Sequence, residues 1–193
     1  MPQAKILIFA GSSREGSFNK KLAKVVCALA IKAGAQATFI DLKDYPMPLY
    51  DGDLEAKEGL PANALKLKEL FMAHQALLIA CPEYNSSISG LLKNTIDWVS
   101  RQGKDPQSLM PYKNKVAALV SASPGALGGL RGLVHVRAIL GNIGVLVIPT
   151  QLAISKASEA FNADGTLKDS TQQSSLEKLV QELISTTTKL AVG

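Results

Sequence analysis

Cysteine and histidine are scarce in this 193-residue chain, and their scarcity excludes several kinds of site. The two cysteines, Cys27 and Cys81, have neither CxxC nor metal-ligand spacing, so we expect both to be reduced packing residues. The two histidines, His74 and His135, lie far apart in the sequence, with no carboxylate or cysteine at ligand spacing. We therefore expect no metal site and no catalytic triad.

Long hydrophobic runs are also missing. No uninterrupted apolar stretch approaches the roughly 18 residues that a membrane span requires, and the apolar start of the chain is too short for a signal peptide. We therefore expect a cytoplasmic protein that has no membrane partner.

Aromatic residues and clustered charges are few as well. Lysine and arginine outnumber aspartate and glutamate by 21 to 16, but the lysines are spread along the whole chain and aromatic residues make up only 5% of it. Nucleic-acid binders more often combine basic runs with aromatic residues. We therefore interpret the lysines as a solvated surface and expect no nucleic-acid partner.

Hydrophobic residues, by contrast, are plentiful and regularly arranged, and the length of the chain suits one domain, residues 1–193. Apolar runs predict five buried strands, at 4–10, 37–42, 76–81, 115–120 and 145–148, the last ending at Pro149. Helical periodicity predicts five helices, at 22–33, 61–74, 89–101, 128–142 and 176–190. The remaining long segments, 43–60 and 156–172, are expected to be irregular loops.

This alternation of strands and helices predicts the fold class. Parallel neighbouring strands need crossover connections, which are right-handed, so the pattern indicates an α/β fold: a doubly wound, five-stranded parallel sheet with helices on both faces. Ligands of such sheets bind beyond the carboxyl ends of the strands. We therefore expect functional residues directly after the first, third and fourth predicted strands.

The turn after the first strand, GSSREGSFN at residues 11–19, combines glycine, hydroxyl and basic residues. A helix N-terminus offers unpaired N–H groups and a partial positive charge, and glycines let several N–H groups converge on one anion. The side chains that can add donors to a phosphate here are Ser12, Arg14, Ser17 and Asn19. In the alternative interpretation, Ser17 only caps the helix and the other residues form a polar turn.

Two common phosphate motifs do not match this turn. A P-loop requires lysine where Ser17 stands, and a dinucleotide fingerprint requires glycine where Ser13 stands. The turn therefore predicts a site for a single terminal phosphate, such as that of a mononucleotide.

Polar and small residues also follow the third and fourth strands. The sequence CPEYNSSISG begins at Cys81 and presents Tyr84 as an aromatic face for a flat heteroaromatic ring, unless it is only a loop in which Ser87 or Ser89 caps the next helix. The sequence SASPGALGG begins at Ser121 and would allow close approach of the backbone to a ligand, although turn and cap chemistry explain much of it too.

Three stretches in order, GSSREGSFN, PEYNSSISGLLKNTIDW and SASPGALGG, resemble the signatures of the NAD(P)H-dependent FMN reductase family, a flavodoxin-like group that includes quinone, azo-dye and chromate reductases. The resemblance implies strand order 2-1-3-4-5 and an FMN enzyme that takes a hydride from NADPH or NADH at flavin N5. It implies ping-pong reduction of quinone-like, azo or chromate acceptors. It also implies a homodimer or homotetramer, in which the segments 43–60 and 88–101 would meet a partner.

The resemblance further assigns the cofactor-binding residues. The FMN phosphate would be held by Ser12, Arg14, Ser17, Phe18 and Asn19, and the isoalloxazine ring would be flanked by Pro82, Glu83, Tyr84, Asn85 and Ser86. The ribityl chain or ring edge would touch Ser121, Ser123 and Gly125. No catalytic side chain is required, because the cofactor carries the chemistry. Arg101 either attracts the phosphates of the nicotinamide cofactor or only complements a helix C-terminus.

Two other functions remain open from the residues. A flavodoxin-type electron carrier would bind FMN in the same way, but such carriers tend to be acidic and this chain has a formal net charge of +5. A flavin-free module could bind another phosphate compound at the same turn.

Overall fold

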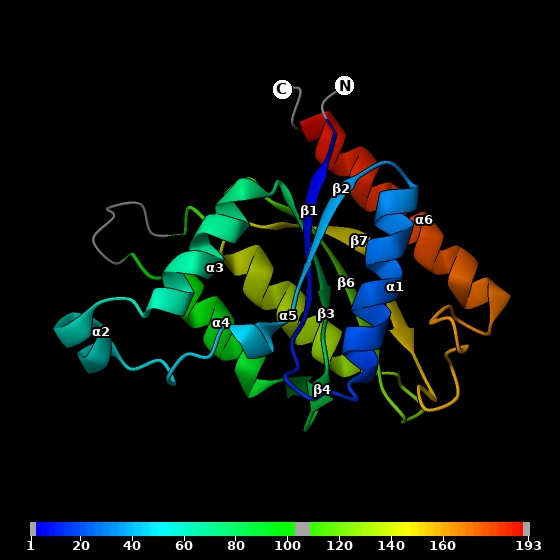
Figure 1. Cartoon of the computed structure of the whole chain (residues 1–193), viewed down its shortest axis with the longest axis horizontal. Coiled ribbons are helices and arrows are strands. Elements are labelled where there is room, and N and C mark those ends of the chain that lie inside the picture. Colours follow the sequence, from blue (N-terminus) through cyan, green and yellow to red (C-terminus); the bar gives the residue numbers. More distant parts are fainter. Residues whose placement is uncertain (1–2, 103–108, 191–193) are drawn as a thin grey trace.

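The central sheet has five parallel strands in the order β2-β1-β3-β6-β7. We describe it from a computed structural model, in residues 3–102 and 109–190 (Figure 1). The strands are β1 (Lys5–Ala10), β2 (Gln36–Ile40), β3 (Ala76–Ala80), β6 (Val116–Ala122) and β7 (Leu146–Ile154). Because β4 and β5 lie outside this sheet, the order is the predicted 2-1-3-4-5. The ends of the predicted domain, 1–193, fall outside the described residues.

Helices cover both faces of the sheet (Figure 1). They are α1 (Phe18–Lys32), α2 (Gly52–Glu58), α3 (Ala62–Ala73), α4 (Gly90–Ser100), α5 (Leu130–Asn142) and α6 (Ser170–Leu190). The hydrophobic clusters place α1 and α6 on one face and α3, α4 and α5 on the other. The predicted doubly wound arrangement is confirmed.

The core is divided between the two faces by the alternation of side chains along each strand. In β1, Ile6 and Ile8 join the cluster under α1 and α6, whereas Leu7 and Phe9 join the cluster under α3, α4 and α5. All four side chains are at most 1% exposed. Burial on both faces is the reason that the strands read as continuous apolar runs in the sequence.

The segment 43–60 is more ordered than predicted. It contains a 3-10 helix, η1 (Leu42–Asp44), and the short helix α2, which begins where the Asp51 side chain accepts hydrogen bonds from the backbone N–H groups of Asp53 and Leu54. Because α2 has no buried residue, its sequence carries no apolar stripe, and the prediction of an irregular loop was wrong for this physical reason.

The last strand was also predicted too short. β7 does not end at Pro149 but continues to Ile154, with a register irregularity where Ala117 pairs with Val147 and Leu119 pairs with Gln151. β7 lies at the edge of the sheet, where a proline at an irregularity removes no essential ladder hydrogen bond.

A second, small sheet follows β3. It is an antiparallel ribbon of β4 (Glu83–Tyr84) and β5 (Ser87–Ile88), in a stretch that the sequence predicted as a loop. Within 3–102 and 109–190, no helix is long and apolar enough to cross a bilayer, and no group of three acidic, histidine or cysteine side chains is placed to hold a metal ion.

Candidate functional site

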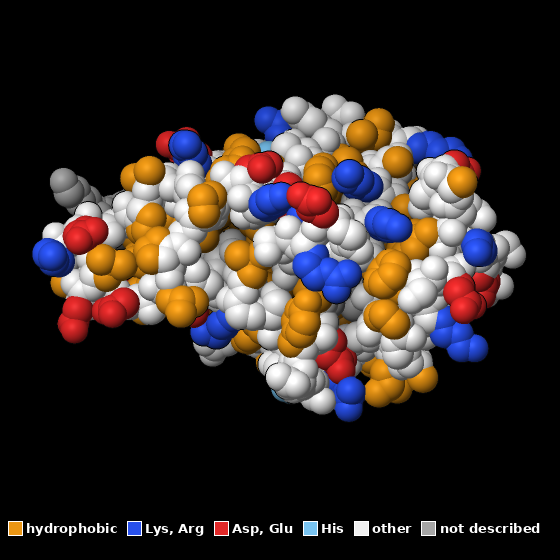
Figure 2. Space-filling model, turned by 60° about the horizontal axis from the view of Figure 1, so that its bottom comes forward, with side chains coloured by type: hydrophobic (Ala, Val, Ile, Leu, Met, Phe, Trp, Pro, Cys, Tyr) orange, Lys and Arg blue, Asp and Glu red, His pale blue; other side chains and the backbone are white. Residues whose placement is uncertain are grey.

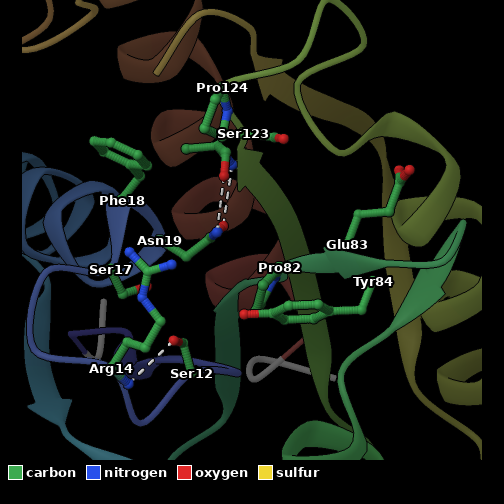
Figure 3. Close-up of a pocket in the computed structure, with 11 residues that line it drawn as sticks. Ser12, Arg14, Ser17, Phe18, Asn19, Pro82, Glu83, Tyr84, Ser123 and Pro124 are labelled. Atoms are coloured by element: carbon green, nitrogen blue, oxygen red, sulfur yellow. Dashed lines mark hydrogen bonds between the residues drawn. The ribbon is translucent and has the colours of Figure 1, made fainter. Parts of the chain in front are cut away.

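A cavity of about 150 Å³ lies beyond the carboxyl ends of β1, β3 and β6 (Figure 3). Three segments that are far apart in the sequence form its wall, and these are the three segments predicted from the strand ends. The lining residues are Ser12, Arg14, Ser17, Phe18, Asn19, Pro82, Glu83, Tyr84, Ala122, Ser123 and Pro124.

Four of the predicted residues do not line this cavity: Asn85, Ser86, Ser121 and Gly125. Two residues that the sequence did not single out, Ala122 and Pro124, do line it. Both lie within the SASPG stretch beside Ser123, and because three consecutive residues at and beyond the end of β6 line the cavity, no alternating pattern could have found them.

The loop between β1 and α1 ends in a helix cap. Ser17 is the N-cap of α1, and its side chain accepts a hydrogen bond from the backbone N–H of Lys20. No acidic residue lies in the first turn of α1, so no carboxylate of that turn compensates the positive end of the helix dipole. Ser17 therefore both caps the helix and lines the cavity, and the two interpretations of this turn are compatible.

Arg14 carries an uncompensated charge at the cavity. Its backbone N–H donates to Ser12 Oγ at 3.4 Å, and its guanidinium lies toward Ser17 and Asn19 (Figure 3), making no ion pair with any residue that the structure describes. Two nearby lysines are neutralised: Lys20 pairs with Asp41 and Lys43 pairs with Glu15. Arg14 is therefore the cation of this loop that is available to an anion.

Asn19 joins two walls of the cavity. Its Nδ2 donates to the carbonyl of Ala122 at 2.9 Å and its Oδ1 accepts from the backbone N–H of Ala122 at 3.0 Å (Figure 3). The residue is only 4% exposed. The amide thus fixes α1 to the end of β6, rather than standing free as a donor.

The ribbon of β4 and β5 presents an aromatic ring at the rim. Asn85 and Ser86 form its turn with φ values of 50° and 65°, the positive values at both positions that a two-residue type I′ hairpin turn requires. Tyr84, just before the turn, is 53% exposed and its ring lies beside the cavity (Figure 3). Asn85 and Ser86 shape the ribbon and lie outside the lining.

The carboxylate of Glu83 points away from the cavity, toward α5 (Figure 3). Its Oε2 accepts from the backbone N–H of Gly132 at 3.1 Å, and its Oε1 pairs with Arg131 Nη2 at 2.9 Å. Gly129, the N-cap of α5, has no side chain to cap that helix, so Glu83 supplies the missing acceptor. Burial alone would raise the pKa of Glu83, but the hydrogen bonds from Gly132 and Arg131 and the charge of Arg131 outweigh burial and lower it.

The glycine-rich segment after β6 is shaped mainly by packing. Ser121 is fully buried and donates to the carbonyl of Gly128 at 2.8 Å. Gly128 has a φ of 63°, and a Cβ there would lie 2.7 Å from the backbone of Ile154. Turn chemistry therefore explains these residues, and Ser123 is the hydroxyl that reaches the cavity.

The other residues considered from the sequence have ordinary structural surroundings. Cys81 is fully buried, and burial raises the pKa of its thiol. His74 contacts the Leu70 carbonyl and Thr38 Oγ1 within the fold. Arg101 ends α4, donates to the carbonyl of Asp97 and lies 5.1 Å from the ring centroid of Tyr50.

The face that carries the strand ends is mixed in character. Lysine and arginine side chains are spread over it among hydrophobic ones and do not merge into one patch in this view (Figure 2). This face therefore suits binding of an anion at one local site better than binding of an extended negatively charged surface.

Comparison with known proteins agrees with this architecture. A family model described as NADPH-dependent FMN reductase matches residues 4–159. The chain is 34% identical over 180 residues to an NAD(P)H-dependent FMN reductase of Pseudomonas aeruginosa, covering 93% of this chain and 92% of that protein. It is 33% identical over 147 residues to a quinone reductase of Escherichia coli K12, covering 75% and 73% of the two chains.

A solved structure shares the whole fold. FerB, a flavoenzyme NAD(P)H:(acceptor) oxidoreductase from Paracoccus denitrificans, superimposes with a TM-score of 0.82 at 30% identity, covering 96% of this chain and 98% of that one.

Proposed function

Because the chain belongs to the NADPH-dependent FMN reductase family, and is therefore an NAD(P)H-dependent enzyme with FMN as cofactor, we propose that the cavity between Ser12 and Pro124 is its FMN site. The observation that carries this assignment is the unpaired guanidinium of Arg14 at the N-terminus of α1. We propose further that the whole chain acts as one FMN-binding domain.

The donors at the inner end of the cavity suit a phosphate. The hydroxyls of Ser12 and Ser17, the N-terminus of α1 and the Arg14 side chain converge there, and charge-assisted contacts of this kind are strong. Phe18 and Asn19 complete this end of the lining.

The size of the cavity supports a position of the cofactor ring at its rim. A volume of about 150 Å³ lies below the roughly 300–1,000 Å³ of pockets that enclose a whole ligand. The cavity therefore suits the phosphate and the adjoining chain, with Ser123 beside them, while the ring lies against Pro82 and Tyr84 with one face open to a second substrate.

The chemistry that FMN supplies when bound is two-electron transfer from the nicotinamide of NADPH or NADH to an acceptor. The protein's residues would hold and orient the reactants, and we propose that backbone N–H groups near Tyr84 would stabilise negative charge at the rim. No side chain is assigned as an acid or base. A single open face at the rim would serve donor and acceptor in turn, so we propose a ping-pong cycle.

Quinones are the acceptor class that we propose first, because the relatives described above include a quinone reductase. A further relative, from a Burkholderia species, is a 2-hydroxy-1,4-benzoquinone reductase at 30% identity over 164 residues, which is 84% of this chain and 85% of that one. Azo compounds and chromate are further acceptors that a rim-bound ring could reduce.

The test combines a spectrum with steady-state kinetics. The purified chain should show flavin absorbance that bleaches when NADPH is added without oxygen and returns when menadione is added. Initial rates at varied NADPH and menadione should give parallel double-reciprocal lines, as ping-pong kinetics require. A protein that cannot be loaded with FMN contradicts the site, and intersecting lines contradict the cycle.

A homo-oligomer is the partner that we propose. The helix α2 has no buried residue, although a seven-residue helix is not stable by itself in water. Leu49, just before it, is 80% exposed, and Leu65 beyond it is 48% exposed. A second copy of the chain covering these residues in a homodimer or homotetramer would account for both observations.

A further inference from the structure

The first turn of α1 contains a buried lysine. Lys20 is 7% exposed and lies three residues after the N-cap Ser17, where the positive end of the helix dipole disfavours a cation. Holding a long side chain in one conformation also costs entropy. A lysine at this position therefore requires specific compensation, and the proposed cofactor contacts do not involve it.

The compensation comes from two oxygen atoms on different elements. Lys20 Nζ donates to Asp41 Oδ2 at 2.6 Å and to the carbonyl of Ser13 at 3.1 Å. The other carboxylate oxygen, Asp41 Oδ1, accepts from the backbone N–H of Lys43 at the start of η1. The ammonium thus connects the loop after β1 to the chain that follows β2.

The contact with Ser13 fixes the orientation of one peptide unit. In a trans peptide the C=O and the following N–H point in opposite directions. Since the Ser13 carbonyl faces Lys20, the backbone N–H of Arg14 faces the other way, where it donates to Ser12 Oγ at the cavity wall (Figure 3). The position of Lys20 therefore determines how this loop presents Ser12 and Arg14.

We propose that Lys20 is a positioning residue for the phosphate end of the FMN site. This inference rests on the proposed function. Lys20 is not assigned as a phosphate contact, because it does not line the cavity and two of its three ammonium N–H groups donate to Asp41 and Ser13. It acts through the Ser13–Arg14 peptide, and its loss should weaken binding of the phosphate while leaving the contacts of the ring intact.

Comparing FMN with riboflavin, which lacks the phosphate, tests this role. The flavin-free protein is titrated with each compound by fluorescence quenching, using the parent chain, Lys20→Met and the double variant Lys20→Met with Asp41→Asn. Both variants should raise the Kd for FMN about tenfold, equivalent to one lost charge-assisted hydrogen bond, and should change the Kd for riboflavin less than about twofold. Lys24→Met, an exposed lysine one turn further along α1, should change neither value.

The outcomes distinguish a positioning role of Lys20 from a purely structural one. An equal rise in both Kd values shows that Lys20 only supports the fold and overturns the proposal, as does an unchanged Kd for FMN. If Lys20→Met does not fold, Asp41→Asn provides the test, because it keeps the lysine. This variant should still lower the preference for FMN over riboflavin, and an unchanged preference contradicts the proposal. If the parent chain itself binds FMN and riboflavin equally, the phosphate assignment of the proposed function is wrong, and this inference fails with it.

Discussion

Glu83 caps a helix that begins almost fifty residues later in the chain, because its Oε2 accepts the backbone N–H of Gly132 at 3.1 Å. The same residue belongs to the ribbon that carries Tyr84. The ribbon beside the cavity and the N-terminus of α5 are therefore held in place by one carboxylate.

Replacing Glu83 tests this coupling. Glu83→Ala should lower the free energy of unfolding by about 1–2 kcal/mol, the usual cost of losing a helix cap, and should raise the KM for menadione by displacing Tyr84. Glu83→Gln should retain most of the stability, because its amide oxygen can still accept from Gly132. Urea denaturation and steady-state kinetics measure the two effects, with exposed Glu159→Ala as the control. Equal effects of the alanine and glutamine variants would contradict a role as hydrogen-bond acceptor.

The pH dependence of this contact follows from the lowered pKa of Glu83. Because the pKa in the folded chain lies below the unfolded value of about 4.3, the carboxylate stabilises the fold above that value, and the contribution is lost only as the pH falls through the lower, folded pKa. The difference in unfolding free energy between the parent and Glu83→Gln should thus stay constant from neutral pH to about pH 5 and shrink in more acidic solution. Urea denaturation at several pH values measures it, and a difference that shrinks between pH 7 and pH 5 would show that the carboxylate is not stabilised as described.

Arg14 should be needed for FMN and dispensable for the fold. Its exposed guanidinium makes no ion pair among the described residues, so Arg14→Ala should leave the unfolding temperature nearly unchanged. The loss of one charge-assisted contact should raise the Kd for FMN about tenfold or more, and Arg14→Lys should restore part of it. Fluorescence titration gives the Kd, and Lys32→Ala at the far end of α1 is the control. Unchanged affinity in Arg14→Ala would place the phosphate elsewhere.

Leu49 should report on assembly. Leu49→Asp puts a charge on a side chain that is 80% exposed, so it should not unfold the chain but should disrupt an interface formed there. Light scattering coupled to size exclusion should show a dimer or tetramer for the parent and a smaller species for the variant. Ile31→Asp, at a 59% exposed position on α1, should keep the parental mass. A monomeric parent, or an unchanged mass for Leu49→Asp, would rule out this surface.

The sequence was sufficient to predict that three separate segments meet at one edge of the sheet, where the structure has a cavity. Apolar runs identified the strands of the sheet, and a parallel sheet brings the carboxyl ends of its strands to one edge, so the segments beginning at Ser12, Pro82 and Ser121 had to meet. This prediction was possible because a strand that is buried on both faces of a sheet has a continuous apolar run in its sequence.

The direction of individual side chains could not be predicted in the same way. Asn19 bonds to Ala122 and Glu83 to Gly132, each across a long stretch of sequence that contains no local sign of the pairing. The helix α2 was missed because it buries nothing within its own chain, and hydrophobic periodicity reports only buried faces.

The burial of Cys81 has a consequence for the chemistry beside it. Quinones are electrophiles that arylate thiolates, and an enzyme that reduces them is exposed to covalent inactivation by its own substrates. Burial raises the pKa of both thiols, Cys81 and Cys27, which lowers the thiolate fraction of each near neutral pH. We expect mass spectrometry after many turnovers with 1,4-benzoquinone to find no adduct on sulfur, which would make the chain durable toward the quinone acceptors that we propose.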